Sequence, residues 1–110
     1  MTSLPIDIRP HDLTIVQDIL KTVLPTGTHV FVFGSRAKWT TKRSSDLDLA
    51  IDAGRALTRN EDVCLSSEFM ESDLPYKVDI VDLHNVSDSF KAIINKNKIP
   101  LPGFTPEEYG

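Results

Sequence analysis

Two aspartates one residue apart, Asp46 and Asp48, lie in the segment SDLDLAID, in which polar and apolar residues alternate. This alternation predicts a strand, and residues i and i+2 of a strand point to the same face. Two unpaired carboxylates about 7 Å apart repel each other, and divalent cations between them remove the penalty. Oxygen-only ligands favour Mg²⁺, or Mn²⁺, over zinc. The pair therefore predicts a metal site, and two ions fit it better than one.

A glycine and a serine, Gly34 and Ser35, end an apolar run, and ten residues separate them from Asp46. Gly34 lets another group approach the backbone closely, and a short helix after Ser35 would point N–H groups at an anion. Arg36 could pair with a phosphate or with one of the aspartates. Gly-Ser also occurs in plain turns, and Asp-x-Asp at solvated strand edges. Their occurrence together favours a site for phosphate and metal.

A third carboxylate is expected from KVDIVDL, residues 77–83, which reads as another strand. Asp79 and Asp82 point to opposite faces of such a strand, so only one of them can face the pair. We favour Asp79 because it lies nearer the strand centre. Asp82 lies near the strand end, where a solvated or capping carboxylate is more usual.

The elements that must position these residues follow from hydrophobic periodicity and turn residues. The class expected is α/β (α+β), with a small mixed β-sheet flanked by helices in the order α-β-β-α-β-α. Helices are predicted over residues 11–24, 61–72 and 87–97, and strands over 29–33, 46–52 and 77–83. Residues 36–45 are mostly polar and predict a short helical turn followed by a loop.

Two of these helices carry specific expectations about their faces and ends. In the helix over 61–72, the side chains expected to point partly inward are Val63, Leu65, Phe69 and Met70. Ser87 and Asp88 are suitable N-cap residues for the last helix, which presents Phe90, Ile93 and Ile94. The three histidines have no metal-ligand spacing, and surface or capping roles are expected for them.

Length and composition indicate one domain over residues 1–99, followed by a proline-rich tail over 100–110 that is expected to be extended or mobile. The formal charge of −4 disfavours non-specific duplex binding, which depends on counterion release. A single cysteine, Cys64, allows no intrachain disulfide and fits a reducing compartment. The N-terminal residues do not resemble a signal peptide, and no apolar run is long enough for a membrane span. We therefore expect a cytoplasmic protein.

The spaced motif resembles a known family. Gly34-Ser35, ten residues, then Asp46-x-Asp48 matches the signature of the DNA polymerase β-like nucleotidyltransferase superfamily. FVFGSRA, SDLDLAI and VDIVDL look like its minimal nucleotidyltransferase (MNT) branch, whose members are often antitoxin partners of HEPN-domain ribonucleases. The resemblance covers about residues 10–95. It identifies the superfamily more specifically than it identifies the substrate.

The resemblance implies an enzyme with a defined site. Gly34, Ser35 and Arg36 would bind the phosphates of ATP or another nucleoside triphosphate. Asp46 and Asp48 would bind two Mg²⁺ ions, and Asp79 would be the third ligand and help to deprotonate the attacking hydroxyl. The reaction would be in-line attack on the α-phosphate, with pyrophosphate as the leaving group.

The function expected from the resemblance is transfer of AMP to a HEPN-type ribonuclease toxin, which neutralises the toxin. Two alternatives stay open, namely an antitoxin that acts by binding alone and a catalytic subunit of an aminoglycoside-type nucleotidyltransferase. Lys38 and Trp39 depart from the family pattern, in which many members have a glycine or small polar residue soon after Gly-Ser-Arg-Ala. Trp39 either stacks on a base, fills a groove of a partner, or packs on the core.

Overall fold

A four-stranded sheet with helices on both faces forms the framework of the computed structural model, which describes residues 8–34 and 46–104. The helices are α1 (Pro10–Val23), α3 (Arg59–Met70) and α4 (Asp88–Asn97), and the strands are β1 (His29–Phe33), β2 (Leu47–Asp52), β3 (Val78–Asp82) and β4 (Ile99–Pro100). The strand order is β3-β2-β1-β4, with β2 and β3 parallel and β1 antiparallel to both β2 and β4. The predicted α/β class and the order of the first six elements are confirmed. The turn predicted over 36–45 lies outside the described residues.

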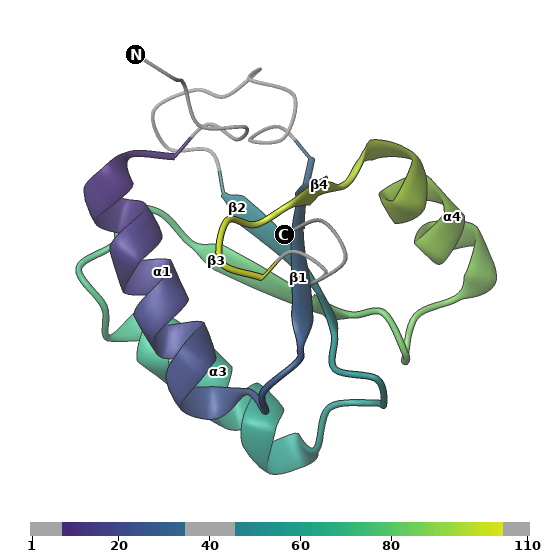
Figure 1. The fold of residues 1–110 in the computed structure, drawn as a ribbon, viewed down its shortest axis with the longest axis horizontal. Coiled ribbons are helices and arrows are strands. Elements are labelled where there is room, and N and C mark those ends of the chain that lie inside the picture. Colours follow the sequence, from purple (N-terminus) through teal and green to yellow (C-terminus); the bar gives the residue numbers. More distant parts are fainter. Residues whose placement is uncertain (1–7, 35–45, 105–110) are drawn as a thin grey trace.

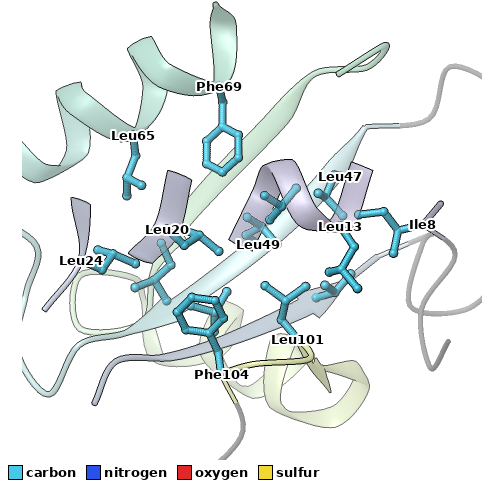
Figure 2. Packing of buried hydrophobic residues seen from close by; sticks show 14 residues of the cluster. Ile8, Leu13, Leu20, Leu24, Leu47, Leu49, Leu65, Phe69, Leu101 and Phe104 are labelled. Carbon is cyan, nitrogen blue, oxygen red and sulfur yellow. The ribbon is translucent and has the colours of Figure 1, made fainter. Parts of the chain in front are cut away.

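Helices α1 and α3 lie side by side against one face of the sheet, and α4 lies toward the other (Figure 1). The first face carries the main core, in which Leu47, Leu49 and Ile51 of β2 are completely buried. Leu65 and Phe69 of α3 cover this core from above in Figure 2. The second face carries a smaller cluster around Phe31, Ala50, Leu83 and Ile94. The large core thus holds β2 and β3 rigidly and leaves part of their second face open to solvent.

The segment after α4 contributes a strand that the sequence did not predict. Ile99 and Pro100 pair with β1 as β4, and the Leu101 N–H donates to the Val30 carbonyl at 2.9 Å. Leu101 is completely buried and Phe104 is 9% exposed, and both pack in the main core (Figure 2). Pro100 is tolerated because β4 is an edge strand. The described part of the tail over 100–110 is therefore packed; the division into a domain over 1–99 and a tail stays a prediction.

Helix α3 begins at Arg59, two residues before the predicted start. Thr58 is its N-cap, and its hydroxyl accepts from the Glu61 N–H while the Glu61 carboxylate accepts from the Thr58 N–H. This reciprocal capping box fixes the helix start. Leu65 and Phe69 point inward as predicted, one turn apart. The prediction was wrong for Val63 and Met70, which are 56% and 85% exposed because they lie on the outer side of the helix.

Helix α4 has the predicted cap, since the Ser87 hydroxyl accepts from the Phe90 N–H. Only Ile94 of its apolar residues is fully buried, whereas Phe90 and Ile93 are 39% and 58% exposed. A small apolar contact area, rather than a broad buried face, therefore joins α4 to the sheet.

A buried aspartate ties α1 to the segment that leads into β3. Asp12 is 1% exposed and accepts hydrogen bonds from Arg9 Nε at 3.0 Å, from Arg9 Nη2 at 3.2 Å and from the Tyr76 hydroxyl at 3.1 Å. A buried carboxylate is tolerated when it is paired and hydrogen-bonded in this way. The cluster fixes Tyr76 three residues before Asp79 and so helps to set the position of β3.

Within the described ranges, no helix combines the length and the apolar character that crossing a bilayer requires.

Candidate active site

The two aspartates of the Asp-x-Asp motif differ in their surroundings. Leu47 and Leu49 are buried in the main core, so Asp48 between them points to the opposite face and is half-buried there. Asp46 lies just before β2 and is exposed. The burial of these two leucines therefore determines the face of β2 to which Asp48 points, whereas Asp46 is exposed to solvent.

Asp79 lies directly across from Asp48 on the neighbouring parallel strand, as register partners. Directly paired residues of adjacent strands point to the same face, so the two carboxylates come together. Lys77 Nζ lies 3.9 Å from Asp79 Oδ1, and its side chain is 75% exposed. This solvated lysine offsets only part of the negative charge, since exposed ion pairs contribute little.

Asp82, the other carboxylate considered on β3, is used within the fold. Its Oδ2 accepts from the Leu57 N–H at 2.7 Å and its Oδ1 accepts from the His84 N–H at 2.9 Å. These bonds fix the loop before α3 and the turn after β3. The register thus places Asp79 rather than Asp82 beside Asp48, in agreement with the choice made from the strand centre.

Gly34 lies against Asp48 at the end of β1. Phe33 is the register partner of Asp48, and Gly34 follows it with φ of +77°, a conformation that favours glycine. A Cβ atom at Gly34 would collide with Oδ2 of Asp48. The glycine is therefore required both by its backbone conformation and by the close approach of the carboxylate. Ser35 and Arg36, the other predicted phosphate ligands, and Trp39 lie outside the described residues.

The carboxylates impose an electrostatic cost on the fold. Partial burial, the charges of Asp79 and Asp46 and a hydrogen bond to Asp79 raise the pKa of Asp48 to about 6. A carboxyl group is raised in this way when its charged form is poorly solvated and faces other negative charges. A cation at this position would remove the repulsion, so the shift marks a place suited to positive charge.

Oxygen donors of this kind fit Mg²⁺ or Mn²⁺. Within residues 8–34 and 46–104, however, no three His, Cys, Asp or Glu side chains are gathered closely enough to hold an ion. The fold brings together a pair, Asp48 and Asp79, with Asp46 exposed nearby. The donor set and its repulsion fit a divalent cation, and the predicted ligand role of all three aspartates stays a prediction.

An aromatic contact beside the carboxylates was not predicted from the sequence. The ring of Phe33 meets that of Phe90 edge-to-face, with centroids 6.1 Å apart and an interplanar angle of 82°. Lys98 Nζ lies 4.1 Å from the ring centroid of Phe31, which lies on β1 like Phe33. These contacts hold α4 against β1 next to Asp48. No local pattern signals them, because α4 and β1 are more than fifty residues apart in sequence.

Paired carboxylates on adjacent strands, beside a glycine that ends a third, are the arrangement expected of a nucleotidyl-transfer site. The chain belongs to the family described as "Polymerase beta, Nucleotidyltransferase", whose model matches residues 15–102. It is similar to a protein of Haemophilus influenzae named "Probable protein adenylyltransferase MntA", with 43% identity over 91 residues, 83% of this chain and 79% of the relative.

Two solved structures share the fold. A toxin–antitoxin structure with AMP-PNP has a TM-score of 0.70 and 26% identity, and the match covers 84% of this chain and 73% of that one. A structure of the toxin–antitoxin MntA–HepT has a TM-score of 0.64 and 22% identity, with coverage of 86% and 73%. The second likeness concerns the fold alone, because its identity is low.

Proposed function

We propose that this chain is a Mg²⁺-dependent adenylyltransferase that transfers AMP from ATP to a hydroxyl of a HEPN-type ribonuclease toxin and thereby acts as its antitoxin. The observation that carries the proposal is the pairing of Asp48 with Asp79 across parallel strands, against Gly34. The family match, the adenylyltransferase named among its relatives and the toxin–antitoxin structure with AMP-PNP support it.

In this proposal Asp46, Asp48 and Asp79 hold two Mg²⁺ ions, and Gly34, Ser35 and Arg36 hold the nucleotide phosphates. The metal would neutralise charge on the attacking and leaving oxygens. Gly34 contributes by having no side chain, because a Cβ there would collide with Oδ2 of Asp48 and displace the carboxylate from the position in which it would hold a metal ion. The protein mainly positions and stabilises the reacting groups.

The proposed reaction is an in-line displacement at phosphorus. The acceptor hydroxyl oxygen forms a bond to the α-phosphorus, and the bond from that phosphorus to the bridging oxygen of the β-phosphate breaks. The hydroxyl proton passes to Asp79, and pyrophosphate leaves with the electron pair of the broken bond. Asp79 suits the proton transfer because its side chain is 45% exposed and an acceptor can reach it.

A cytoplasmic location is part of the same proposal. The single cysteine, Cys64, is a free thiol in the described structure, which is consistent with a reducing compartment. The net charge of −4 argues against direct non-specific binding of nucleic acid. In this proposal the chain therefore recognises the toxin through protein–protein contacts and not through the RNA that the toxin binds.

The test uses ATP labelled at the α-phosphate, Mg²⁺ and a purified HEPN-domain ribonuclease as the acceptor. Label is expected on the ribonuclease together with loss of its RNA cleavage. Asp48→Ala or Asp79→Ala should lower the transfer rate at least about a hundredfold, since each removes charge stabilisation at the reacting centre. Label at the γ-phosphate should not be transferred, because it leaves with pyrophosphate.

Asp18→Asn is the matched control, because it removes an exposed carboxylate of α1 and should leave transfer unchanged. A variant with Asp46, Asp48 and Asp79 all changed to alanine separates transfer from occlusion. Full neutralisation of the ribonuclease by this variant, with no label from the wild type, would show that the chain acts by binding alone.

A further inference from the structure

Strand β3 forms one edge of the sheet, and its outer side is unpaired within the described residues. The Leu47 N–H donates to the Lys77 carbonyl and the Leu83 N–H donates to the Ile51 carbonyl. In a parallel pair, every second residue directs its backbone N–H and C=O groups toward the neighbouring strand. Asp79 and Val81, which lie between Lys77 and Leu83 in this alternation, therefore also bond to β2. The N–H and C=O groups of the residues between them, Val78, Ile80 and Asp82, therefore point away from the sheet, and of these the Asp82 carbonyl accepts from the Asn85 N–H in the turn after β3.

This edge lies at the bottom of a groove. One cavity of about 490 Å³ lies between α3 and the first half of β3, and its apolar lining includes Phe69, Met70, Leu74 and Tyr76. A second cavity of about 520 Å³ continues past the end of β3 to Val86 and Phe90. Asp62 and Ile80 line both, so the two cavities adjoin along the strand edge; the first is mainly apolar, whereas Arg59, Asp82 and Asn85 make the second more polar. Met70 is 85% exposed at its rim.

Asp79 belongs to the strand edge that lines the first cavity, and its carboxylate lies on the opposite face of the sheet, beside Asp48. Unpaired strand edges with an apolar groove beside them bind extended peptides by β-strand addition. Charged side chains on an edge strand oppose pairing with a second copy of the same edge, and β3 carries Asp79 and Asp82. The occupant favoured is therefore a different chain, with apolar side chains for the groove.

We propose that the β3 edge binds an extended segment of the acceptor protein as a fifth strand and so delivers the acceptor hydroxyl to Asp79; this inference rests on the proposed function. Side chains directly opposite each other on paired strands lie about 5 Å apart at Cβ. A serine, threonine or tyrosine opposite Asp79 therefore places its hydroxyl on the carboxylate face. The residues on either side of it point to the α3 face.

The geometry consequently defines an acceptor sequence. The hydroxyl residue is flanked by two apolar residues, which face the cavity that Phe69, Met70 and Leu74 line. Backbone hydrogen bonds to Val78 and Ile80 give affinity without regard to sequence, and the flanking side chains give specificity. The hydroxyl itself is selected by its position opposite Asp79.

Amide hydrogen exchange tests the docking directly. In the free protein the amides of Val78, Ile80 and Asp82 should exchange fast, and those of Asp79, Val81 and Leu83 slowly. The unmodified HEPN-domain ribonuclease used as the acceptor is added with Mg²⁺ and an ATP analogue whose α,β bridge cannot be cleaved. The three outward amides should then slow by at least about tenfold, as newly paired strand amides do.

Substitutions in the groove provide the kinetic test. Ser66 of α3 lines the first cavity together with Met70. Met70→Asp and Ser66→Trp should raise the KM for the ribonuclease about tenfold, equivalent to about 1.4 kcal/mol, and change kcat less than about twofold. Val63→Asp is the matched control, because Val63 is an exposed apolar residue of the same helix that does not line the groove. Affinity for the ATP analogue should be equal in all three variants.

The outcomes separate the two proposals. Transfer of AMP by the wild type with no slowing of the Val78, Ile80 and Asp82 amides overturns the docking inference alone. Equal KM values for Met70→Asp and Val63→Asp overturn it as well. If the wild type transfers no AMP, the proposed function fails, and unprotected amides in the same mixture then reject the docking surface independently.

Discussion

Asp48 is the residue at which folding and function conflict. Buried leucines on either side force its carboxylate onto one face, and the strand register then places Asp79 beside it. The pKa of Asp48 is raised to about 6, so the metal-free fold holds a charge that it solvates poorly. In the proposed function, bound Mg²⁺ would remove this cost.

This conflict predicts a pH dependence of stability. Because the folded-state pKa of Asp48 lies above its unfolded value, the native state binds a proton more tightly, and stability falls as the pH rises between about 4 and 6. Asp48→Asn does not titrate and should lack this loss. With EDTA present, the Tm of Asp48→Asn relative to wild type should therefore increase from about pH 4 to about pH 7. Thermal unfolding followed by circular dichroism measures this difference.

Asp18→Asn controls for the removal of a surface carboxylate, and its Tm difference should stay flat over the same range. If the Tm of Asp48→Asn relative to wild type stayed constant or fell with rising pH, the electrostatic account of the site would be contradicted.

At the scale of elements, caps and turns determine where β3 and α3 lie relative to each other. Asp82 accepts from Leu57 and His84 backbone amides and so joins the end of β3 to the start of α3. Glu61 accepts from Thr58 and, at 2.8 Å, from two Arg55 nitrogens, and these bonds lower the pKa of Glu61 to about 2, with Arg55 as the larger cause. The shape of the groove between α3 and β3 depends on these hydrogen bonds, because they fix where β3 ends and where α3 begins.

Removal of the Thr58 cap should destabilise the protein modestly. Thr58→Ala leaves the Glu61 N–H without its acceptor, and loss of an N-cap costs about 1 kcal/mol. Urea unfolding should show a lower midpoint with an unchanged m-value. Thr58→Ser should restore the wild-type midpoint. Thr22→Ala, an exposed threonine within α1, should change stability by less than about 0.5 kcal/mol. Equal effects of the Thr58 and Thr22 changes would contradict the capping role.

At the scale of the whole molecule, the chain after α4 closes the core. Leu101 is completely buried, and β4 pairs with β1 at the sheet edge opposite β3. Gln17 Nε2 donates to the Pro102 carbonyl at 2.8 Å, which ties this segment to α1 as well. The chain after α4 thus covers β1 with a two-residue strand, and β3 forms the opposite edge of the sheet.

Leu101→Ala should therefore destabilise the protein by about 2–5 kcal/mol, the range for a leucine removed from a packed core. Ile93→Ala is the matched control, since Ile93 is 58% exposed and its loss should cost less than about 0.5 kcal/mol. Denaturant unfolding measures both free energies. Similar small losses in the two variants would indicate that the segment after α4 is peripheral to the fold.

Local sequence signals predicted most elements, because each has a periodic apolar pattern and a cap or turn residue at its ends. The strand at 29–33 and the cap at Ser87 agree with the structure. The missed elements lack such signals. Ile99–Pro100 is too short for periodicity, and the outward direction of Met70 depends on which face of α3 meets the sheet.

The candidate site divides in the same way. The sequence alone determined the residue types and the strand period, so the oxygen donors offered by Asp46 and Asp48 and the close approach of another group to Gly34 could be predicted from it. Only the tertiary structure decided which carboxylate of β3 faces Asp48, because register is set by pairing between strands distant in sequence. The open β3 edge has the same origin, since strand order is a property of the assembled sheet.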